Sequence, residues 1–315
     1  MLWANSRYRG ADYALTMEKV ACDLGEAICD AKERLGYERI VLAGWSGGGS
    51  LSMWYQSLAE AGEGIADTAA GDPYEVDAGR LPPADIVLML AAHISRHGIL
   101  TEWMDPSIHD ERAPHQRDPL LNLYDPANPN QPPYSTDFLE TFRAAQIERN
   151  RRITAWVKDK LTVIRASDTP HGEFGFTVHG TMADPRWLDP NVDPSDRRPG
   201  WCYLGDPRVV NDGPVGIARF SSLRSWLSQW SYDDARCDAL SSAANVSVPV
   251  LVVGNTADDA CTPSHTHRLY DAVGHDRRQL HQVEGATHYY TGPQGREHMA
   301  EAIGVVTGFI DRHLD

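Results

Sequence analysis

The strongest constraint on the fold of this chain is a serine, Ser46, that lies between a predicted buried strand and a predicted helix. It is the centre of the sequence Gly-Trp-Ser-Gly-Gly at residues 44–48, which follows an apolar run at residues 40–43 and precedes a helix predicted for residues 50–60. A strand that turns directly into a helix needs glycine beside the turn, because glycine adopts unusual backbone angles and has no side chain to clash. Such a turn exposes the hydroxyl above the sheet edge, next to helix amides that stabilise negative charge. The segment therefore predicts a nucleophilic serine.

Two later segments place an acid and a base after predicted strands. The apolar run at residues 248–253 is typical of a buried parallel strand, and Asp258 and Asp259 follow it. Further along, residues 280–283 form a short predicted strand, and the turn after it contains His288. The order along the chain is therefore serine, aspartate, histidine, each in a loop at the C-terminal end of a strand.

These segments resemble the α/β-hydrolase fold superfamily, specifically its serine esterases, in which the catalytic triad has this order. The resemblance covers residues 1 to about 95 and about 245 to 315. It implies that Ser46 is the nucleophile, that His288 is the general base and then the general acid, and that Asp258 orients the imidazole. It also implies that the amide of Gly47 lies in the oxyanion hole. Trp45, inside the turn, is expected to lie near the substrate.

Asp258 and Asp259 compete for the role of the triad acid. Counting from Pro249 at the start of the strand favours Asp258, whereas counting back from Pro263 favours Asp259. We prefer Asp258, because strand register determines the position of a side chain more strictly than loop length does. The other carboxylate is then a solvated loop residue or a helix cap.

Strands and helices alternate along the chain with a single interruption. Strands are predicted at residues 2–5, 39–43, 86–92, 250–253 and 279–283, with helices at residues 13–35, 264–272 and 295–313. This alternation predicts an α/β fold, a mostly parallel, doubly wound sheet with active-site loops on one rim. More than 200 positions separate Ser46 from Asp258, so a large inserted cap, mainly helical and rich in loops, is expected. We place the cap at residues 96–244 and the core at residues 1–95 and 245–315.

The expected cap contains two apolar helical patterns. The first is at residues 135–161, and its stripe is interpreted as ordinary packing. The second is at residues 220–230, where Leu223, Trp226, Leu227 and Trp230 recur at helical spacing. This second stripe either lines an apolar substrate pocket or anchors the cap to the core, and anchoring is the more common use of such a stripe.

One part of the superfamily pattern has no counterpart in this sequence. The segment that residues 2–10 resemble is usually preceded by early strands and by a loop that supplies the second oxyanion amide. We expect the natural chain to begin upstream of residue 1. Two alternatives are that a cap or partner-chain group replaces the donor, or that the protein is a non-catalytic relative.

Composition and charge restrict the partners. The net charge of −15 and the absence of a concentrated basic segment argue against nucleic acid. No apolar run approaches ~20 residues, so we expect no membrane span or secretion signal and a cytoplasmic location. The five scattered cysteines predict neither a disulfide scaffold nor a zinc knuckle. His93 and His97 have metal-binding spacing only on a helix, and because they follow a strand we expect no metal and no cofactor.

The expected activity is hydrolysis of a small-molecule carboxylic ester through an acyl-enzyme. Thioesterase, lactonase, acyltransferase and carbon–carbon bond hydrolase activities use the same three residues and stay open. A binding protein that keeps the fold without turnover is the alternative from another functional class. The natural substrate, the second oxyanion donor and the oligomeric state are not determined by the sequence.

Overall fold

A four-stranded parallel sheet forms the centre of the molecule. The computed structural model describes residues 2 and 5–314, and its main sheet has the order β1 (Val41–Trp45), β4 (Ile86–Leu90), β7 (Val250–Asn255), β8 (Arg278–Val283). All three pairings are parallel, and their register places Gly44 opposite Met89 and Val253 opposite His281. The predicted parallel α/β sheet is thus confirmed. Among the described residues, β1 pairs with β4 alone.

Both faces of the two central strands are buried, which explains their continuous apolar sequences. Val87 and Met89 of β4 pack with α2 (Gly47–Ala61) and α9 (Pro263–Ala272) on one face. Ile86 and Leu88 pack on the other face against α10 (Gly295–Leu314). The alternation along the strand therefore gives each face its own core.

The predicted core elements occur with small shifts at their ends. Helix α1 (Met17–Glu33) occupies the middle of the helix predicted at residues 13–35 and is preceded by a short 3-10 turn, η1 (Asp12–Ala14). The strand predicted at residues 2–5 falls mainly on residues 3 and 4, which lie outside the described part of the chain. Between α2 and β4 lie a small antiparallel pair, β2 (Ile65–Asp67) and β3 (Pro73–Val76), and a second 3-10 turn, η2 (Ala78–Arg80).

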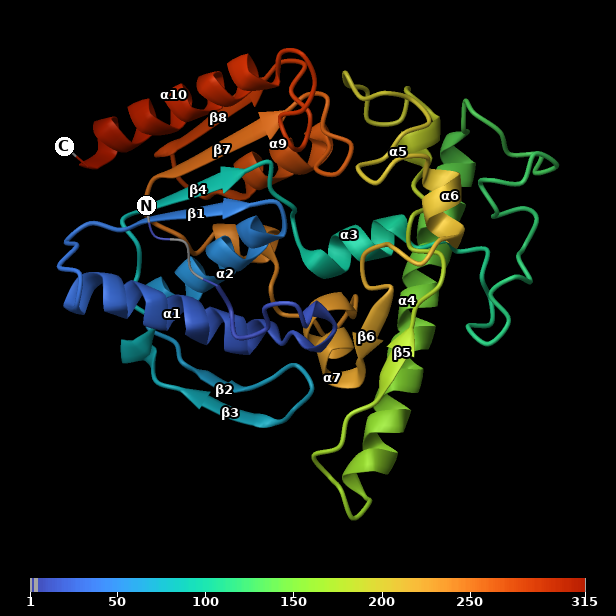
Figure 1. The fold of residues 1–315 in the computed structure, drawn as a ribbon, viewed down its shortest axis with the longest axis horizontal. Helices are drawn as coiled ribbons and strands as arrows, with labels where there is room; N and C mark the ends of the chain where they lie inside the picture. The colour runs from blue at the N-terminus through green and yellow to red at the C-terminus, as the bar shows by residue number, and fades with distance from the viewer. Residues whose placement is uncertain (1, 3–4, 315) are drawn as a thin grey trace.

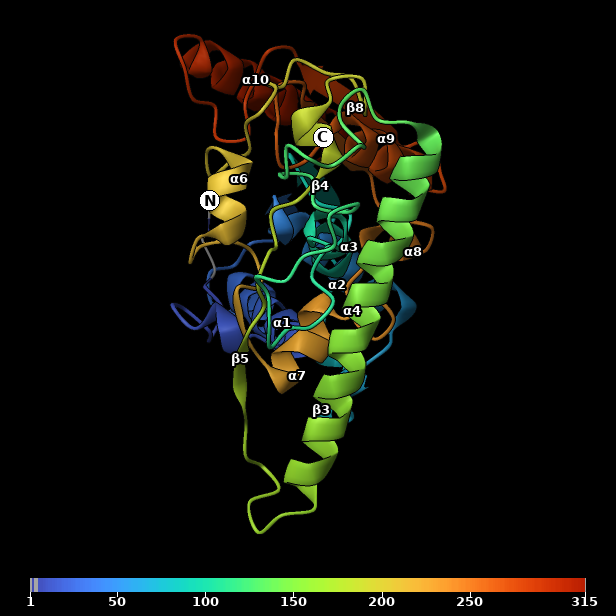
Figure 2. The same ribbon diagram turned by 90° about the vertical axis from the view of Figure 1, so that its right-hand side faces the viewer.

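The chain between β4 and β7 contributes no strand to the main sheet. In Figure 1 the helices α3 to α6 of this segment lie beyond the ends toward which the strand arrows point. Figure 2 shows α4 as one long helix along a side of the molecule. The elements of this segment, in order, are α3 (Arg96–Trp103), α4 (Thr136–Arg165), β5 (Gly175–Thr177), α5 (Pro185–Leu188), α6 (Pro207–Asp212), β6 (Phe220–Ser222), α7 (Leu223–Ser225), the π-helical turn η3 (Trp226–Trp230) and α8 (Ala239–Ala243).

The helical pattern at residues 220–230 was only partly correct. Residues Phe220–Ser222 form β6, which pairs antiparallel with β5, and only the remainder is helical. Apolar spacing cannot reveal a strand partner that lies more than 40 residues away in the sequence, so pairing with β5 overrides the local pattern. By contrast, the helix predicted at residues 135–161 is confirmed as α4, whose first turn is capped by the Ser135 hydroxyl.

Candidate active site

Ser46 lies in the tight turn between β1 and α2, with an unusual backbone conformation. Its φ is 53° and its ψ is −124°, a combination that a residue with a Cβ rarely adopts. The loop after β4 holds it in place. The Ser46 amide donates to the carbonyls of Leu90 and Ala91, both at 3.1 Å, and its carbonyl accepts from the amide of His93 at 3.1 Å. The turn is therefore stabilised by backbone hydrogen bonds with the end of β4 and the loop that follows it.

Two glycines make this turn possible, and one of them is outside the five-residue motif. A Cβ on Gly44 would lie 2.4 Å from the carbonyl oxygen of Gly48, and a Cβ on Gly49 would lie 2.4 Å from Cβ of Ala92. A Cβ on Gly48, by contrast, would meet nothing within 4 Å. The close approach of α2 to β1 thus depends on Gly44, and its close approach to the loop after β4 depends on Gly49.

Ser46, His288 and Asp258 form one chain of hydrogen bonds. The Ser46 Oγ lies 3.1 Å from His288 Nε2, and His288 Nδ1 lies 2.8 Å from Asp258 Oδ2. Because an ionised carboxylate only accepts hydrogen bonds, Nδ1 carries the proton and Nε2 is left to accept from the serine hydroxyl. The other oxygen of Asp258 accepts from the amides of Ala260 and Cys261, at 2.8 and 2.7 Å. This arrangement fixes both the carboxylate and the imidazole.

The two adjacent aspartates occupy different environments. Asp258 is completely buried and meets His288, whereas the backbone carbonyl of Asp259 accepts a hydrogen bond from the indole of Trp187 at 2.7 Å. Burial, together with the charge of Asp258, raises the pKa of the Asp259 carboxyl to about 6. The structure therefore joins Asp258, and not Asp259, to the histidine.

A cavity of about 190 Å³ opens over Ser46 and Gly47. The Gly47 amide is the first of α2, where backbone N–H groups have no acceptor within the helix, so it is available to a ligand. Four aromatic side chains dominate the wall. The lining residues are Ser46, Gly47, His93, Arg96, Ile99, Trp103, Tyr203, Ile217, Trp230, Ala260, His288 and Tyr289.

The apolar stripe at residues 223–230 packs chiefly within the segment that the sequence assigns to the cap. Leu223, Trp226, Leu227 and Trp230 are all buried in a cluster with α3 and α4, to which the expected core contributes Ala70. Anchoring of the cap to the core by this stripe stays a prediction. Trp230 also lines the cavity.

Trp45 lies beside the histidine and is not among the residues that line the cavity. Its ring centroid is 4.8 Å from that of His288 and 5.3 Å from that of Tyr289, and 44% of the residue is exposed. Contact between Trp45 and the substrate stays a prediction.

Sequence reasoning missed the environment of His93 and Cys261. His93 Nδ1 lies 3.2 Å from Cys261 Sγ, and burial together with the nearby His288 lowers the pKa of His93 well below its ordinary value. His97, which was considered together with His93, instead lies 3.5 Å from Asp238. A histidine directly after a buried parallel strand was the available signal, because such positions lie on the active rim.

One group of side chains in the described residues has the geometry to hold a metal ion. The potential ligand atoms of Asp258, Cys261 and His288 lie within 4.8 Å of one another. Two of these residues already form the hydrogen-bonded pair beside Ser46, so a metal would compete with that pair.

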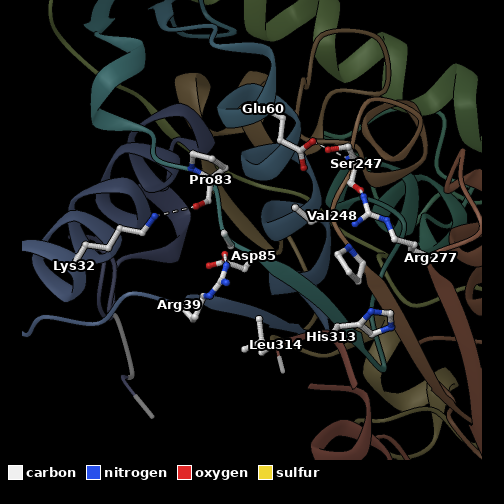
Figure 3. Close-up of a pocket in the computed structure, with 12 residues that line it drawn as sticks. Lys32, Arg39, Glu60, Pro83, Asp85, Ser247, Val248, Arg277, His313 and Leu314 are labelled. Carbon is white, nitrogen blue, oxygen red and sulfur yellow. Dashed lines mark hydrogen bonds and ion pairs between the residues drawn. The ribbon is translucent and has the colours of Figure 1, made fainter. Parts of the chain in front are cut away.

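A larger hollow, of about 510 Å³, lies at the opposite end of the sheet, where the strands begin (Figure 3). Its charged side chains are already engaged. Arg39 pairs with Asp85 at 2.8 Å, Lys32 donates to the carbonyl of Pro83 at 3.4 Å, and Glu60 accepts from the amide of Ser247 at 2.7 Å. Ser46 and His288 lie at the other rim, so this hollow is separate from the candidate active site.

No helix in residues 5–314 is long and apolar enough to cross a membrane.

Comparison with known proteins gives structural matches only. No protein-family model matches the chain, and no curated protein does. Solved structures that match include a monoacylglycerol lipase of Paleococcus ferrophilus, with 16% identity, coverage of 93% of this chain and 76% of that one, and a TM-score of 0.41. An alpha/beta fold family hydrolase of Bacillus anthracis str. Sterne matches with 12% identity, coverage of 93% and 74%, and a TM-score of 0.39. A proline iminopeptidase of Mycobacterium smegmatis matches with 18% identity, coverage of 94% and 72%, and a TM-score of 0.38.

These matches are α/β-hydrolase fold proteins, the superfamily that the sequence motifs resemble. Identities below 20% and TM-scores below 0.5 carry no argument about substrate or reaction. The fold class of this chain rests on its own parallel sheet and strand order.

Proposed function

We propose that this protein is a serine hydrolase that cleaves a carboxylic ester through an acyl-enzyme. The observation that carries the proposal is the hydrogen-bonded chain from Ser46 Oγ through His288 to the buried Asp258, open to a cavity on the serine side. A serine hydroxyl is a poor nucleophile at neutral pH unless a base removes its proton as it attacks. His288 Nε2 is within hydrogen-bonding reach of that proton.

In the proposed reaction, Ser46 Oγ attacks the ester carbonyl while its proton moves to His288 Nε2. Asp258 stabilises the resulting imidazolium through Nδ1–H, and the amide of Gly47 donates to the oxyanion. Collapse of the intermediate breaks the bond to the alcohol, which leaves with the proton from Nε2. Water, deprotonated by the same nitrogen, then attacks the acyl-serine, and the bond to Oγ breaks as the proton on Nε2 returns to Ser46 and the acid is released.

We also propose that residues 96–244 act as a cap on a core made of residues 1–95 and 245–315. The support is that Trp103, Tyr203 and Trp230, all from this segment, line the cavity together with Ser46. Small-molecule pockets are lined mostly by apolar side chains with few polar groups. The cap would supply these apolar side chains and would therefore determine which acyl group fits.

The test is hydrolysis of p-nitrophenyl esters, from acetate to long acyl chains, by the protein and by Ser46→Ala. Turnover that disappears in Ser46→Ala, together with fluorophosphonate labelling of Ser46 in the unmodified protein, is the expected result. A folded protein that neither turns over any ester or thioester nor takes the label would be a non-catalytic binding protein, contrary to the proposal.

A further inference from the structure

Arg96 places a positive charge next to the nucleophile. It is the first residue of α3, and it lines the same cavity as Ser46 and Gly47. A Cβ built on Gly47 would lie 3.5 Å from both Nε and Nη2 of Arg96. The guanidinium is therefore in contact distance of the turn that carries the proposed nucleophile.

This guanidinium has no carboxylate partner in the described residues. Its Nη1 donates to Gln229 Oε1 at 2.7 Å, whereas Nε is shielded from solvent and has no acceptor, and Nη2 makes no hydrogen bond within residues 5–314. The buried Arg149 pairs with Glu111, and the buried Arg186 pairs with Asp184 and Glu102. The buried Arg197, like the partly buried Arg96, makes no ion pair among the described residues. Burial without such a partner lowers the pKa of Arg96.

The contacts of Arg96 hold the charge in place without a bonded anion, and burial lowers its pKa more than the nearby Cys237 and Asp12 raise it. Gln229 is itself fixed, since its Nε2 donates to the carbonyls of Asp12 and Leu15 and to the hydroxyl of Ser225. The indole of Trp230 lies 5.8 Å from the guanidinium carbon. An amide oxygen and an aromatic ring orient an arginine, but neither carries a negative charge.

The other titratable groups on the cavity wall do not supply the missing anion. His93 and His288 are imidazoles, and the tyrosines at positions 203 and 289 have pKa values raised by burial, so they stay neutral. Asp258 is already bonded to His288 and to two amides. The cavity therefore combines one oriented cation with aromatic walls.

We propose that Arg96 binds a carboxylate carried by the substrate, so that the protein prefers half esters of short dicarboxylic acids to neutral esters. This inference rests on the proposed esterase function. The guanidinium is charged at all times, so a substrate carboxylate, which is also charged before the reaction begins, is a better partner for it than the oxyanion, which exists only during the reaction. The cavity of about 190 Å³ favours a short acyl chain. Arg96 acts here as a specificity-determining residue, and its Nη2 is the donor left to bind the carboxylate, since Nη1 is bonded to Gln229 and Nε is shielded from solvent.

The test compares p-nitrophenyl hemiglutarate with p-nitrophenyl pentanoate, which has the same acyl length without the charge, after subtraction of the Ser46→Ala rate. We expect kcat/KM to favour the charged ester by about tenfold or more, mainly through KM. In Arg96→Gln the ratio of the two kcat/KM values should fall by about tenfold to a hundredfold, and Arg96→Lys should restore part of it. Arg151→Gln, at an exposed arginine paired with Asp233, is the matched control and should keep the ratio.

Three results would overturn the inference. One is a preference of the unmodified protein for the neutral ester. Another is a parallel loss on both esters in Arg96→Gln, which would assign the guanidinium to the oxyanion or to folding. The third is absence of glutarate binding by Ser46→Ala in calorimetry, where we expect this variant to bind glutarate and Ser46→Ala/Arg96→Gln not to bind it. This measurement needs no ester hydrolysis, so it tests the carboxylate site separately from the esterase proposal.

Discussion

Asp258 and Asp259, two adjacent residues near Ser46, lie in different electrostatic environments. Asp258 is buried and its two oxygens are occupied by His288 and by backbone amides, so its ionised form is compensated. Asp259 is partly buried and lies next to a like charge, and both effects raise its pKa. One position in the loop after β7 therefore decides which of the two aspartates meets His288.

Asp258→Asn should lower kcat for ester hydrolysis by roughly 10³ to 10⁴, since an amide cannot stabilise the imidazolium or hold the same tautomer. Asp259→Asn is the matched control and should keep kcat within about tenfold. Steady-state hydrolysis of p-nitrophenyl esters at pH 7 to 8 measures both. A larger loss in Asp259→Asn than in Asp258→Asn would assign the acid to Asp259 instead.

Asp259→Asn should also make the folded state more stable at neutral pH. The folded pKa of Asp259 is raised to about 6 from 3.8, so ionisation penalises the folded state fully above pH 6 and not at all below about pH 4. The variant should gain on the order of 2 kcal/mol at pH 8, and the gain should fade as the pH falls toward 4. Urea unfolding of both proteins from pH 4 to 8 measures the difference, and an equal difference at every pH would contradict the assignment.

Among the elements, the junction of β1 and α2 depends on the space beside its glycines. Gly49 brings α2 against the loop after β4, and Gly48 faces open space. The two positions are adjacent in the same helix, so alanine substitutions at both distinguish the effect of packing from the effect of helix propensity.

Gly49→Ala should destabilise the fold by about 1 to 3 kcal/mol, since its Cβ would lie 2.4 Å from that of Ala92. Gly48→Ala should be neutral or stabilising by up to about 1 kcal/mol, because alanine restricts the unfolded chain and favours helix. Thermal unfolding of the two variants provides the comparison. Equal destabilisation by both substitutions would show that the backbone turn, and not the contact with Ala92, requires glycine at these positions.

At the scale of the whole molecule, a buried ionic network ties the segment between β4 and β7 to the rest of the protein. Arg186 of α5 lies 2.5 Å from both Asp184 and Glu102, and Glu102 of α3 lies 2.8 Å from His265 of α9. Burial opposes the charge on each member, but the mutual attraction dominates: the pKa of Arg186 is raised and that of Glu102 is held well below its ordinary value. The network joins three elements that are distant in the sequence.

Arg186→Met should cost about 3 to 5 kcal/mol, because it leaves the buried Asp184 without its cation and removes one of the cationic partners of Glu102. Arg151→Met, which removes an exposed partner of Asp233, should change the unfolding midpoint little. Urea unfolding at pH 7 compares them. Similar midpoints for the two variants would mean that the network does not hold the segment in place.

The sequence by itself determined the local features: the strand–turn–helix around Ser46, the parallel strands, the order of serine, aspartate and histidine, and the helix α4. Each follows from short-range physics, because buried parallel strands require continuous apolar runs, helices show an apolar period and a strained turn needs glycine. Only the tertiary structure decided the choice of Asp258 as the partner of His288, the strand at Phe220–Ser222, the contact of His93 with Cys261 and the unpaired charge of Arg96. These depend on which distant segments pack together. A side chain's charge and type are visible in a sequence, but whether its partner is present depends on neighbours that folding alone brings close.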